Sequence, residues 1–217
     1  MSTDNNPGAG PGTGAASGSE PPGFIQEVRA KFRSWRTVDI VVAAVIGVAI
    51  GVVFWLWNLV WSVTYPLFVA FPPGHAVIYG MWLVSGVLGG LIIRKPGAAL
   101  LTSIAAAAVS AILGTQWGMQ VILAGTMQGL LAELVFLAFA YKRWTMGAAV
   151  LAAAVSALSP AVRNNIVTNV TWPLHYQLIF GVIVVISAGL IAGVGARVLT
   201  TALAKSGALA PFPSAKG

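Results

Sequence analysis

The sequence of 217 residues contains no cysteine, and only five of its side chains are carboxylates. The absence of cysteine excludes disulfide bonds, thiolate metal sites and thiol catalysis. The chain has two histidines and no HExxH or GxSxG motif, so it lacks the groups needed for metal-dependent hydrolysis and common nucleophilic catalysis. It also lacks the GxxxxGK[ST] loop that holds nucleotide phosphates. We therefore expect a protein that is not an enzyme and that needs no cofactor.

Charged side chains of either sign are scarce. They make up 8% of the chain, whereas soluble domains carry about 25%. Hydrophobic residues make up 58%, and the mean hydropathy is +0.87. These values predict an integral membrane protein. Twelve Lys and Arg give a net charge of +7, but they lie beside long apolar runs, so membrane topology explains them better than nucleic-acid binding does.

Composition divides the chain into three regions. Residues 1–23 are rich in Gly, Pro, Ser and Ala and are expected to form a disordered tail. Residues 24–205 are expected to form an all-α membrane domain, and residues 206–217 a short C-terminal tail. Six apolar runs have about the length that crosses 30 Å of hydrocarbon. They extend from Val38 to about Val63, Ala76 to Ile93, Ala98 to Leu113, Gly118 to Tyr141, Met146 to Val162, and Tyr176 to about Leu203.

Basic residues near the ends of these runs are distributed unequally between the two sides. Those on the side of the N-terminus are Arg29, Lys31, Arg33, Arg36, Arg94, Lys95, Lys142, Arg143, Lys205 and Lys216. The opposite side has Arg163. Because cytoplasmic loops carry the excess of Lys and Arg, this asymmetry predicts a multi-pass protein of the cell membrane with both termini in the cytoplasm.

The outward connections combine amides with flat aromatic rings. The relevant residues are Asn58, Trp61, Gln116, Trp117, Asn164, Asn165, Asn169, Trp172, His175 and Tyr176. Trp and Tyr alone are typical of the aromatic belt at the membrane surface. A belt does not require Asn and Gln, whereas a pocket that stacks a flat heterocycle and bonds its nitrogens requires both kinds of residue.

Glu133 is an acid within the apolar run GLLAELVFLAF. It lies roughly 13 Å into the membrane from the inner side at 1.5 Å per residue, so it must face protein or a cavity. The same helix carries Gln120 and Gln128. Two interpretations follow: Glu133 lines a binding cavity with these amides, or it pairs with a basic or hydroxyl group on another helix, with Arg197 the nearest basic candidate.

Three segments resemble the YkoE family of substrate-binding components, the S-components of energy-coupling factor (ECF) transporters. They are WRTVDIVVAAVIGVAIGVVFWLWNLVW, GVLGGLIIRKPGAAL and ILGTQWGMQVILAGTMQGLLAELVFLAFAYKRW. The resemblance covers Trp35 to about Leu203. It implies a six-helix S-component bundle that captures thiamine or its hydroxymethylpyrimidine (HMP) moiety. It also implies a membrane coupling subunit and ATPase subunits as partners.

The first run contains Ala43, Gly47 and Gly51 at four-residue spacing. Such a ladder of small residues lets another helix approach closely. In S-components a ladder on the first helix meets the coupling subunit, and the resemblance implies that these residues form that partner interface. Internal packing is the alternative.

The resemblance implies that the outward amides and aromatics, together with Glu133, bind the ligand. Glu133 would accept from the exocyclic amine or balance the thiazolium charge. The residue types fit thiamine and HMP equally. A stand-alone secondary transporter and a structural membrane subunit without a ligand are the alternatives. A proton-coupled transporter commonly carries several buried ionisable groups, whereas a structural subunit would not need this enrichment in Gln and Asn.

Overall fold

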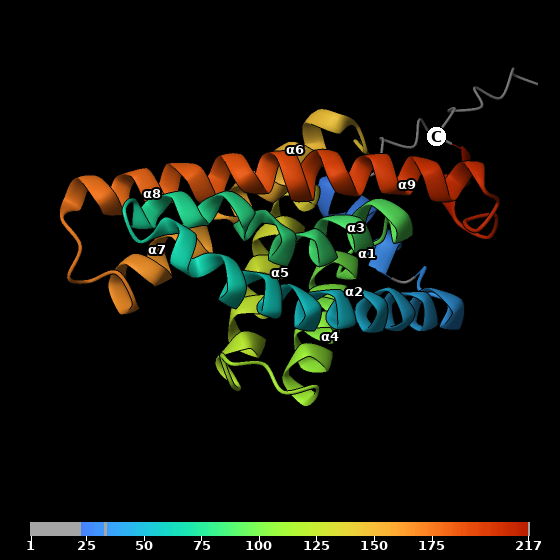
Figure 1. The fold of residues 1–217 in the computed structure, drawn as a ribbon. Helices are drawn as coiled ribbons and strands as arrows, with labels where there is room; N and C mark the ends of the chain where they lie inside the picture. Colours follow the sequence, from blue (N-terminus) through green and yellow to red (C-terminus); the bar gives the residue numbers. More distant parts are fainter. Residues whose placement is uncertain (1–22, 33, 217) are drawn as a thin grey trace, which may run out of the picture.

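The computed structural model describes residues 23–32 and 34–216, and this part of the chain contains helices and no strand (Figure 1). The predicted N-terminal tail, apart from Gly23, lies outside the described residues. The elements are α1 (Phe24–Phe32), α2 (Thr37–Thr64), η1 (Tyr65–Phe68), η2 (Pro72–Leu83), α3 (Val84–Ile93), α4 (Ala98–Ile112), α5 (Gln120–Ala138), α6 (Met146–Ser156), α7 (Leu158–Val167), α8 (Leu174–Ser187), η3 (Ala188–Val194), α9 (Gly195–Lys205) and η4 (Pro213–Lys216).

Five helical segments of the described chain are long and apolar enough to cross a membrane, and α4 is a shorter apolar helix of 15 residues. The five are Thr37–Phe68, Pro72–Ile93, Gln120–Ala138, Met146–Val167 and Leu174–Lys205. Together with α4 they correspond to the six runs expected from the sequence. The all-α membrane architecture is therefore confirmed.

Proline and local winding modify three of the six spans. The second begins as the 3₁₀ helix η2, with Pro72 and Pro73 as its first two residues. The fifth divides at Ala157 into α6 and α7, because Pro160 has no N–H to bond to the carbonyl four residues earlier. The sixth is one rod in which the π-helix η3 joins α8 to α9 (Figure 1).

The small residues of α2 pack inside the bundle. Ala43 is fully buried, and a Cβ atom added to Gly47 would lie 2.4 Å from the Cβ of Ala105 on α4. One added to Gly51 would lie 2.8 Å from the carbonyl oxygen of Ala106. The ladder therefore permits close contact between α2 and α4. The expectation that it forms an exposed surface for a partner helix is wrong for this structure, because α4 already covers it.

A polar contact ties η2 to the long rod. Ser187, at the end of α8, donates its hydroxyl to the Val77 carbonyl at 2.7 Å and accepts the Gly80 N–H at 2.9 Å. A Cβ atom on Gly80 would lie 2.3 Å from the Ser187 carbonyl oxygen, so only glycine permits this approach. The contact fixes the segment of η2 that carries Tyr79 and Trp82.

One end of the bundle, called here the basic end, collects the turns that carry most of the described Lys and Arg. The fully buried Asp39 at the start of α2 accepts from Lys95 at 2.5 Å and from the Arg36 backbone N–H at 2.7 Å. Trp35 donates to the Pro96 carbonyl at 2.9 Å. These contacts join the start of α2 to the turn between α3 and α4.

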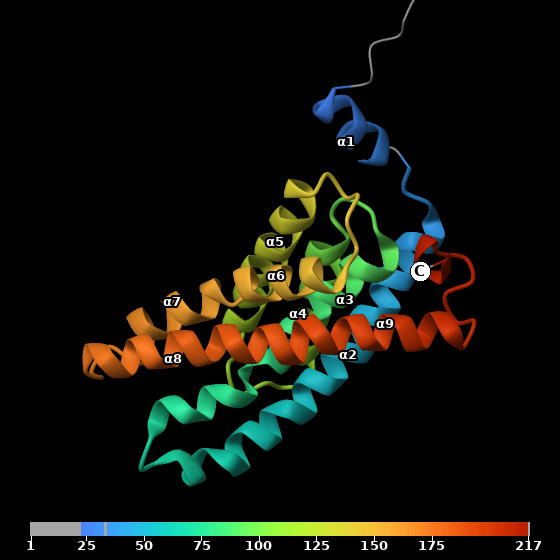
Figure 2. The ribbon, with the colours of Figure 1, turned by 90° about the horizontal axis from the view of Figure 1, so that it is seen from above.

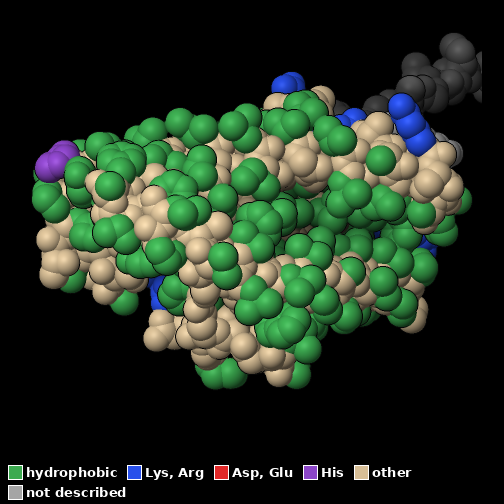
Figure 3. All heavy atoms as spheres, in the orientation of Figure 1, with side chains coloured by type: hydrophobic (Ala, Val, Ile, Leu, Met, Phe, Trp, Pro, Cys, Tyr) green, Lys and Arg blue, Asp and Glu red, His purple; other side chains and the backbone are tan. Residues whose placement is uncertain are grey.

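Apolar side chains are spread over the whole face of the molecule seen in Figure 3.

The segment predicted as a C-terminal tail packs against the basic end. Leu209 and Phe212 belong to the apolar core, and Ser214 donates to the Ile92 carbonyl at 2.9 Å. Arg36 and Arg94 donate to the carbonyls of Pro211 and Pro213. Residues 206–216 are thus folded onto the membrane domain.

Candidate ligand-binding cavity

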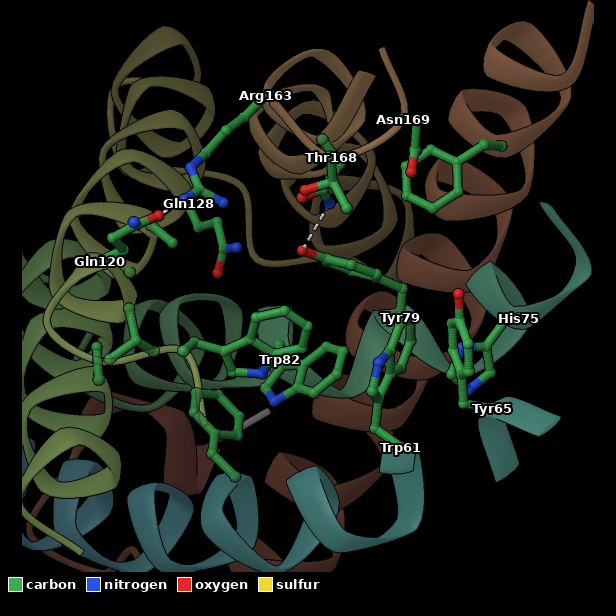
Figure 4. A pocket seen from close by; sticks show the side chains of 18 of the residues that line it. Trp61, Tyr65, His75, Tyr79, Trp82, Gln120, Gln128, Arg163, Thr168 and Asn169 are labelled. Carbon is green, nitrogen blue, oxygen red and sulfur yellow. Dashed lines mark hydrogen bonds between the residues drawn. The ribbon is translucent and has the colours of Figure 1, made fainter. Parts of the chain in front are cut away.

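A cavity of about 180 Å³ lies toward the end of the bundle opposite the basic end (Figure 4). Side chains from α2, η2, α4, α5, α7, α8 and the connections between them surround it. Its lining residues are Phe54, Trp61, Tyr65, Pro72, His75, Tyr79, Trp82, Ala107, Trp117, Gln120, Val121, Ala124, Gly125, Gln128, Arg163, Asn164, Thr168, Asn169, Trp172 and Phe180. Aromatic rings and amides therefore line one concave space, as a small-molecule site requires.

Three aromatic side chains form a continuous wall. The ring centroids of Trp61 and Trp82 are 4.9 Å apart, and those of Tyr79 and Trp82 are 5.1 Å apart. Trp61 also stacks on His75 with a centroid distance of 3.7 Å. The edge-on contact between Tyr79 and Trp82 is one of the favoured geometries of aromatic pairs. The wall is held in place by ring–ring contact and leaves flat faces toward the cavity (Figure 4).

The winding of η2 explains why its aromatic residues share one side. Residues three apart eclipse each other in a 3₁₀ helix, so Tyr79 and Trp82 lie one above the other. The Tyr79 hydroxyl accepts from the Asn164 amide of α7 at 3.0 Å. This hydrogen bond connects the wall to the polar side of the cavity.

Gln128 of α5 brings to the cavity a carboxamide that can still donate and accept hydrogen bonds. Its side chain is 7% exposed and lines the cavity. Within the described chain its carboxamide has no hydrogen-bond partner, although its backbone carbonyl accepts from Ser156. Its amide atoms are accessible from the cavity and are not sealed within protein. The carboxamide of Gln128 is therefore placed to bond a ligand (Figure 4).

The charged part of the lining is Arg163 of α7, which donates to the side-chain amide oxygen (Oε1) of Gln120 on α5. No carboxylate among the described residues lines the cavity. Glu27, Asp39 and Glu133 all make their contacts at the basic end. A cationic ligand would therefore be stabilised by aromatic faces rather than by a counterion.

Glu133 is hydrogen-bonded to the start of α4 and to the turn after α5. Its two oxygens accept the backbone N–H of Gly97 at 2.7 Å, of Ala99 at 2.9 Å and of Leu100 at 3.4 Å, all at the N-terminus of α4. It also accepts the Tyr141 hydroxyl at 2.6 Å. Burial, followed by the neighbouring carboxylate, raises the pKa of Tyr141 well above its ordinary value, so the phenol keeps its proton.

Both sequence interpretations of Glu133 need correction. It does not line the cavity, and its partners are N–H and O–H groups rather than Arg197. Its oxygens cap the otherwise unpaired backbone N–H groups at the start of α4. The pairing interpretation expected a basic or hydroxyl partner on another helix; the other helix, α4, supplies backbone N–H groups, and the hydroxyl comes from Tyr141 in the same predicted run.

The other predicted site residues fall into two groups. Those that line the cavity are Trp61, Trp117, Gln120, Gln128, Asn164, Asn169 and Trp172. Those outside its lining are Asn58, Gln116, Asn165, His175 and Tyr176. Three members of the second group hold connections together: Asn58 donates to Thr115 at 3.0 Å, Gln116 accepts from Ser62 at 3.0 Å, and Asn165 donates to the Gln177 carbonyl at 2.9 Å.

The sequence reasoning missed the contribution of η2. His75 directly precedes the second apolar run, and Tyr79 and Trp82 follow it within the run at spacings of four and three. Rings at that spacing share one face of a helix. The pattern was available, but it was treated as part of a spanning segment. Phe54 and Phe180 were also missed, because single phenylalanines in apolar helices carry no distinguishing signal.

Comparison with known proteins supports these observations. The family model described as "ABC-type cobalt transport system, permease component" matches residues 38–159. A relative from Bacillus subtilis (strain 168), which carries the provisional name HMP/thiamine permease protein YkoE, is 36% identical over 178 residues. The match covers 82% of this chain and 88% of the relative. The chain belongs to the YkoE family.

A solved structure described as an S-component of an ECF transporter is 35% identical to this YkoE-family chain. Its TM-score is 0.80, and the match covers 84% of this chain and 92% of the solved chain. The resemblance inferred from the sequence is confirmed. Membership of a YkoE family of transport components also confirms that the chain is not an enzyme.

Proposed function

We propose that this protein captures thiamine or HMP for an ECF transporter and that the cavity between α2, η2, α5 and α7 is the binding site. The single observation that carries the proposal is the carboxamide of Gln128, which has no hydrogen-bond partner within the described chain and lines the same cavity as a wall of aromatic rings. An aminopyrimidine presents a flat ring with acceptor nitrogens and an amine donor. A carboxamide both donates and accepts, so it complements that edge.

The aromatic wall supplies the remaining affinity. Trp61, Tyr79 and Trp82 offer faces on which the pyrimidine stacks. For thiamine, the cationic thiazolium rests on ring faces, since a cation over Trp gains about 0.5–2 kcal/mol. Asn164 and Asn169 add polar groups near the α7–α8 turn. Glu133 is not part of the proposed site, because four donors already occupy its oxygens.

The proposed topology places the basic end in the cytoplasm and the cavity toward the outside. Among the described residues, Lys and Arg concentrate around α1, the α3–α4 turn, the α5–α6 turn and the end of α9, whereas Arg163 lies at the cavity. This arrangement agrees with the positive-inside rule. Energy would come from ATPase subunits acting through a membrane coupling subunit, since the chain has no nucleotide-binding loop of its own.

Ligand titration of the purified protein, followed by tryptophan fluorescence, tests the proposal. Trp61, Trp82, Trp117 and Trp172 line the cavity and should report a stacked ligand. We expect saturable changes with thiamine or HMP and no change with a sugar of similar size. Gln128→Ala should weaken binding, whereas the matched variant Gln116→Ala, which lies outside the lining, should bind normally. Absence of any saturable change with either compound would refute the assignment.

A further inference from the structure

Helix α1 stands apart from the bundle at the basic end, beside the turn that follows α5 (Figure 2). Its attachment to that turn is polar. Lys31 donates to the carbonyls of Ala140 at 2.9 Å and Tyr141 at 2.8 Å, and Lys142 forms an ion pair with Glu27 at 2.5 Å. The side of α1 that carries Glu27 and Lys31 therefore faces the protein.

The remaining surface of α1 is amphipathic. At about 100° per residue, apolar positions 24, 25, 28 and 32 share an arc of about 100°. Positions 27 and 31 border this arc on one side, and position 29 borders it on the other. Ile25, within the arc, is 73% exposed. The bundle therefore holds the polar border of α1 and leaves Ile25 uncovered by protein.

Two arginines near α1 carry positive charge outside any ion pair with a described carboxylate. Arg29 borders the exposed arc on α1, and Arg143 follows Lys142 in the turn to which α1 is attached. Within the described chain neither arginine forms an ion pair with a carboxylate, and Arg143 lies over the Phe139 ring at 5.9 Å. Arg29 therefore lies next to the exposed Ile25 side of α1, and Arg143 lies in the turn that holds α1 at the basic end.

We propose that α1 is an interfacial helix that lies on the membrane leaflet at the basic end, with its apolar arc in the acyl-chain boundary and Arg29 and Arg143 on anionic lipid headgroups. The charge of α1 and its position at the end of the spanning segments indicate that lipid covers its apolar arc. A helix with an apolar arc and basic borders binds an anionic bilayer surface, and that surface begins where the spanning segments end. Each cation near such a surface contributes about 1 kcal/mol, or about fivefold in partitioning.

The interfacial position would give α1 a mechanical role. Lys31 and Lys142 link it to the α5–α6 turn, and Tyr141 in that turn bonds Glu133, which caps α4. Lipid binding by α1 would therefore hold the turn and the start of α4 at a fixed depth. This inference is independent of the ligand assigned to the cavity.

The chain has no cysteine, so single-cysteine variants of the whole protein give unique labels. Ile25→Cys and the matched control Gln26→Cys, which lies about 150° from the centre of the arc, would carry a bimane fluorophore. The labelled proteins are compared in phosphatidylcholine vesicles with and without phosphatidylglycerol. Lipids brominated in the acyl chain serve as quenchers.

We expect quenching at position 25 to exceed that at position 26 severalfold and to rise with phosphatidylglycerol. Arg143→Gln should lower the phosphatidylglycerol-dependent partitioning of α1 by about fivefold. Equal quenching at the two positions would overturn the proposal. Quenching at position 25 that does not change when phosphatidylglycerol is added would refute the proposed contacts with anionic headgroups. A label that responds only when coupling and ATPase subunits are added would assign the arc to a protein partner instead.

Discussion

Replacement of Glu133 by Gln tests whether this buried acid supports α4 or the ligand. The substitution removes the charge and turns one carboxylate oxygen into an NH₂ group while the side-chain shape is kept. One oxygen accepts Gly97 N–H and the Tyr141 hydroxyl, and the other accepts the N–H groups of Ala99 and Leu100. Whichever oxygen becomes the NH₂ group, two donors lose their acceptor.

The magnitude follows from those bonds. A hydrogen bond to a charged group contributes about 1.5–3 kcal/mol, and a charge at a helix N-terminus contributes about 0.3–2 kcal/mol. Because the Leu100 bond is long at 3.4 Å, we expect a total loss of about 3–5 kcal/mol in the free energy of unfolding. For a chain of this size that corresponds to a fall in Tm of about 6–20 °C.

Thermal unfolding in detergent measures the loss of stability, and fluorescence titration well below the lowered Tm measures binding. We expect Glu133→Gln to bind thiamine or HMP as the parent protein does once the folded fraction is counted. Tyr141→Phe is the matched control, because it removes one donor and keeps the charge, and it should cost less. An unchanged Tm combined with lost binding would show that Glu133 contacts ligand and would refute this reasoning.

Three further substitutions test other parts of the structure. Gln128→Leu should weaken ligand binding by about tenfold or more, as expected for about 1.4 kcal/mol of lost hydrogen bonding, with little change in Tm; normal affinity would exclude the carboxamide from the site. Gly47→Val should destabilise the isolated protein by about 1–3 kcal/mol in thermal unfolding because Ala105 occupies the space, whereas an outward-facing ladder would leave Tm unchanged. Asp39→Asn should cost about 3–5 kcal/mol in the same assay by leaving Lys95 uncompensated; a neutral effect would show that water solvates Lys95.

The number and order of the spans could be predicted from the sequence because hydrocarbon thickness sets the length of an apolar helix. Which side of each helix packs against the rest of the bundle could not be predicted. Ala43, Gly47 and Gly51 predict a close approach by another helix, but small residues are equally suitable for an internal neighbour and for a partner subunit. In this structure α4 takes that place.

The candidate site was predictable where polarity stood out against an apolar background. Gln120 and Gln128 were recognised for that reason and do line the cavity. Tyr79 and Trp82 were not, because aromatic residues also suit membrane interfaces. The role of Glu133 depends on contacts with Gly97, which is 36 residues away in the sequence, and helical periodicity contains no information about that tertiary contact.

The 3₁₀ winding of η2 has a consequence for the aromatic wall it carries. At about 2.0 Å per residue, its 12 residues extend about 24 Å, whereas an α-helix of the same residues would extend about 18 Å. Hydrogen bonds in a 3₁₀ helix have poorer geometry, so backbone amides in η2 should exchange with deuterium faster than those of α3. Rewinding even one turn would shorten the segment and rotate Tyr79 relative to Trp82, so the wall has a built-in capacity to change its shape.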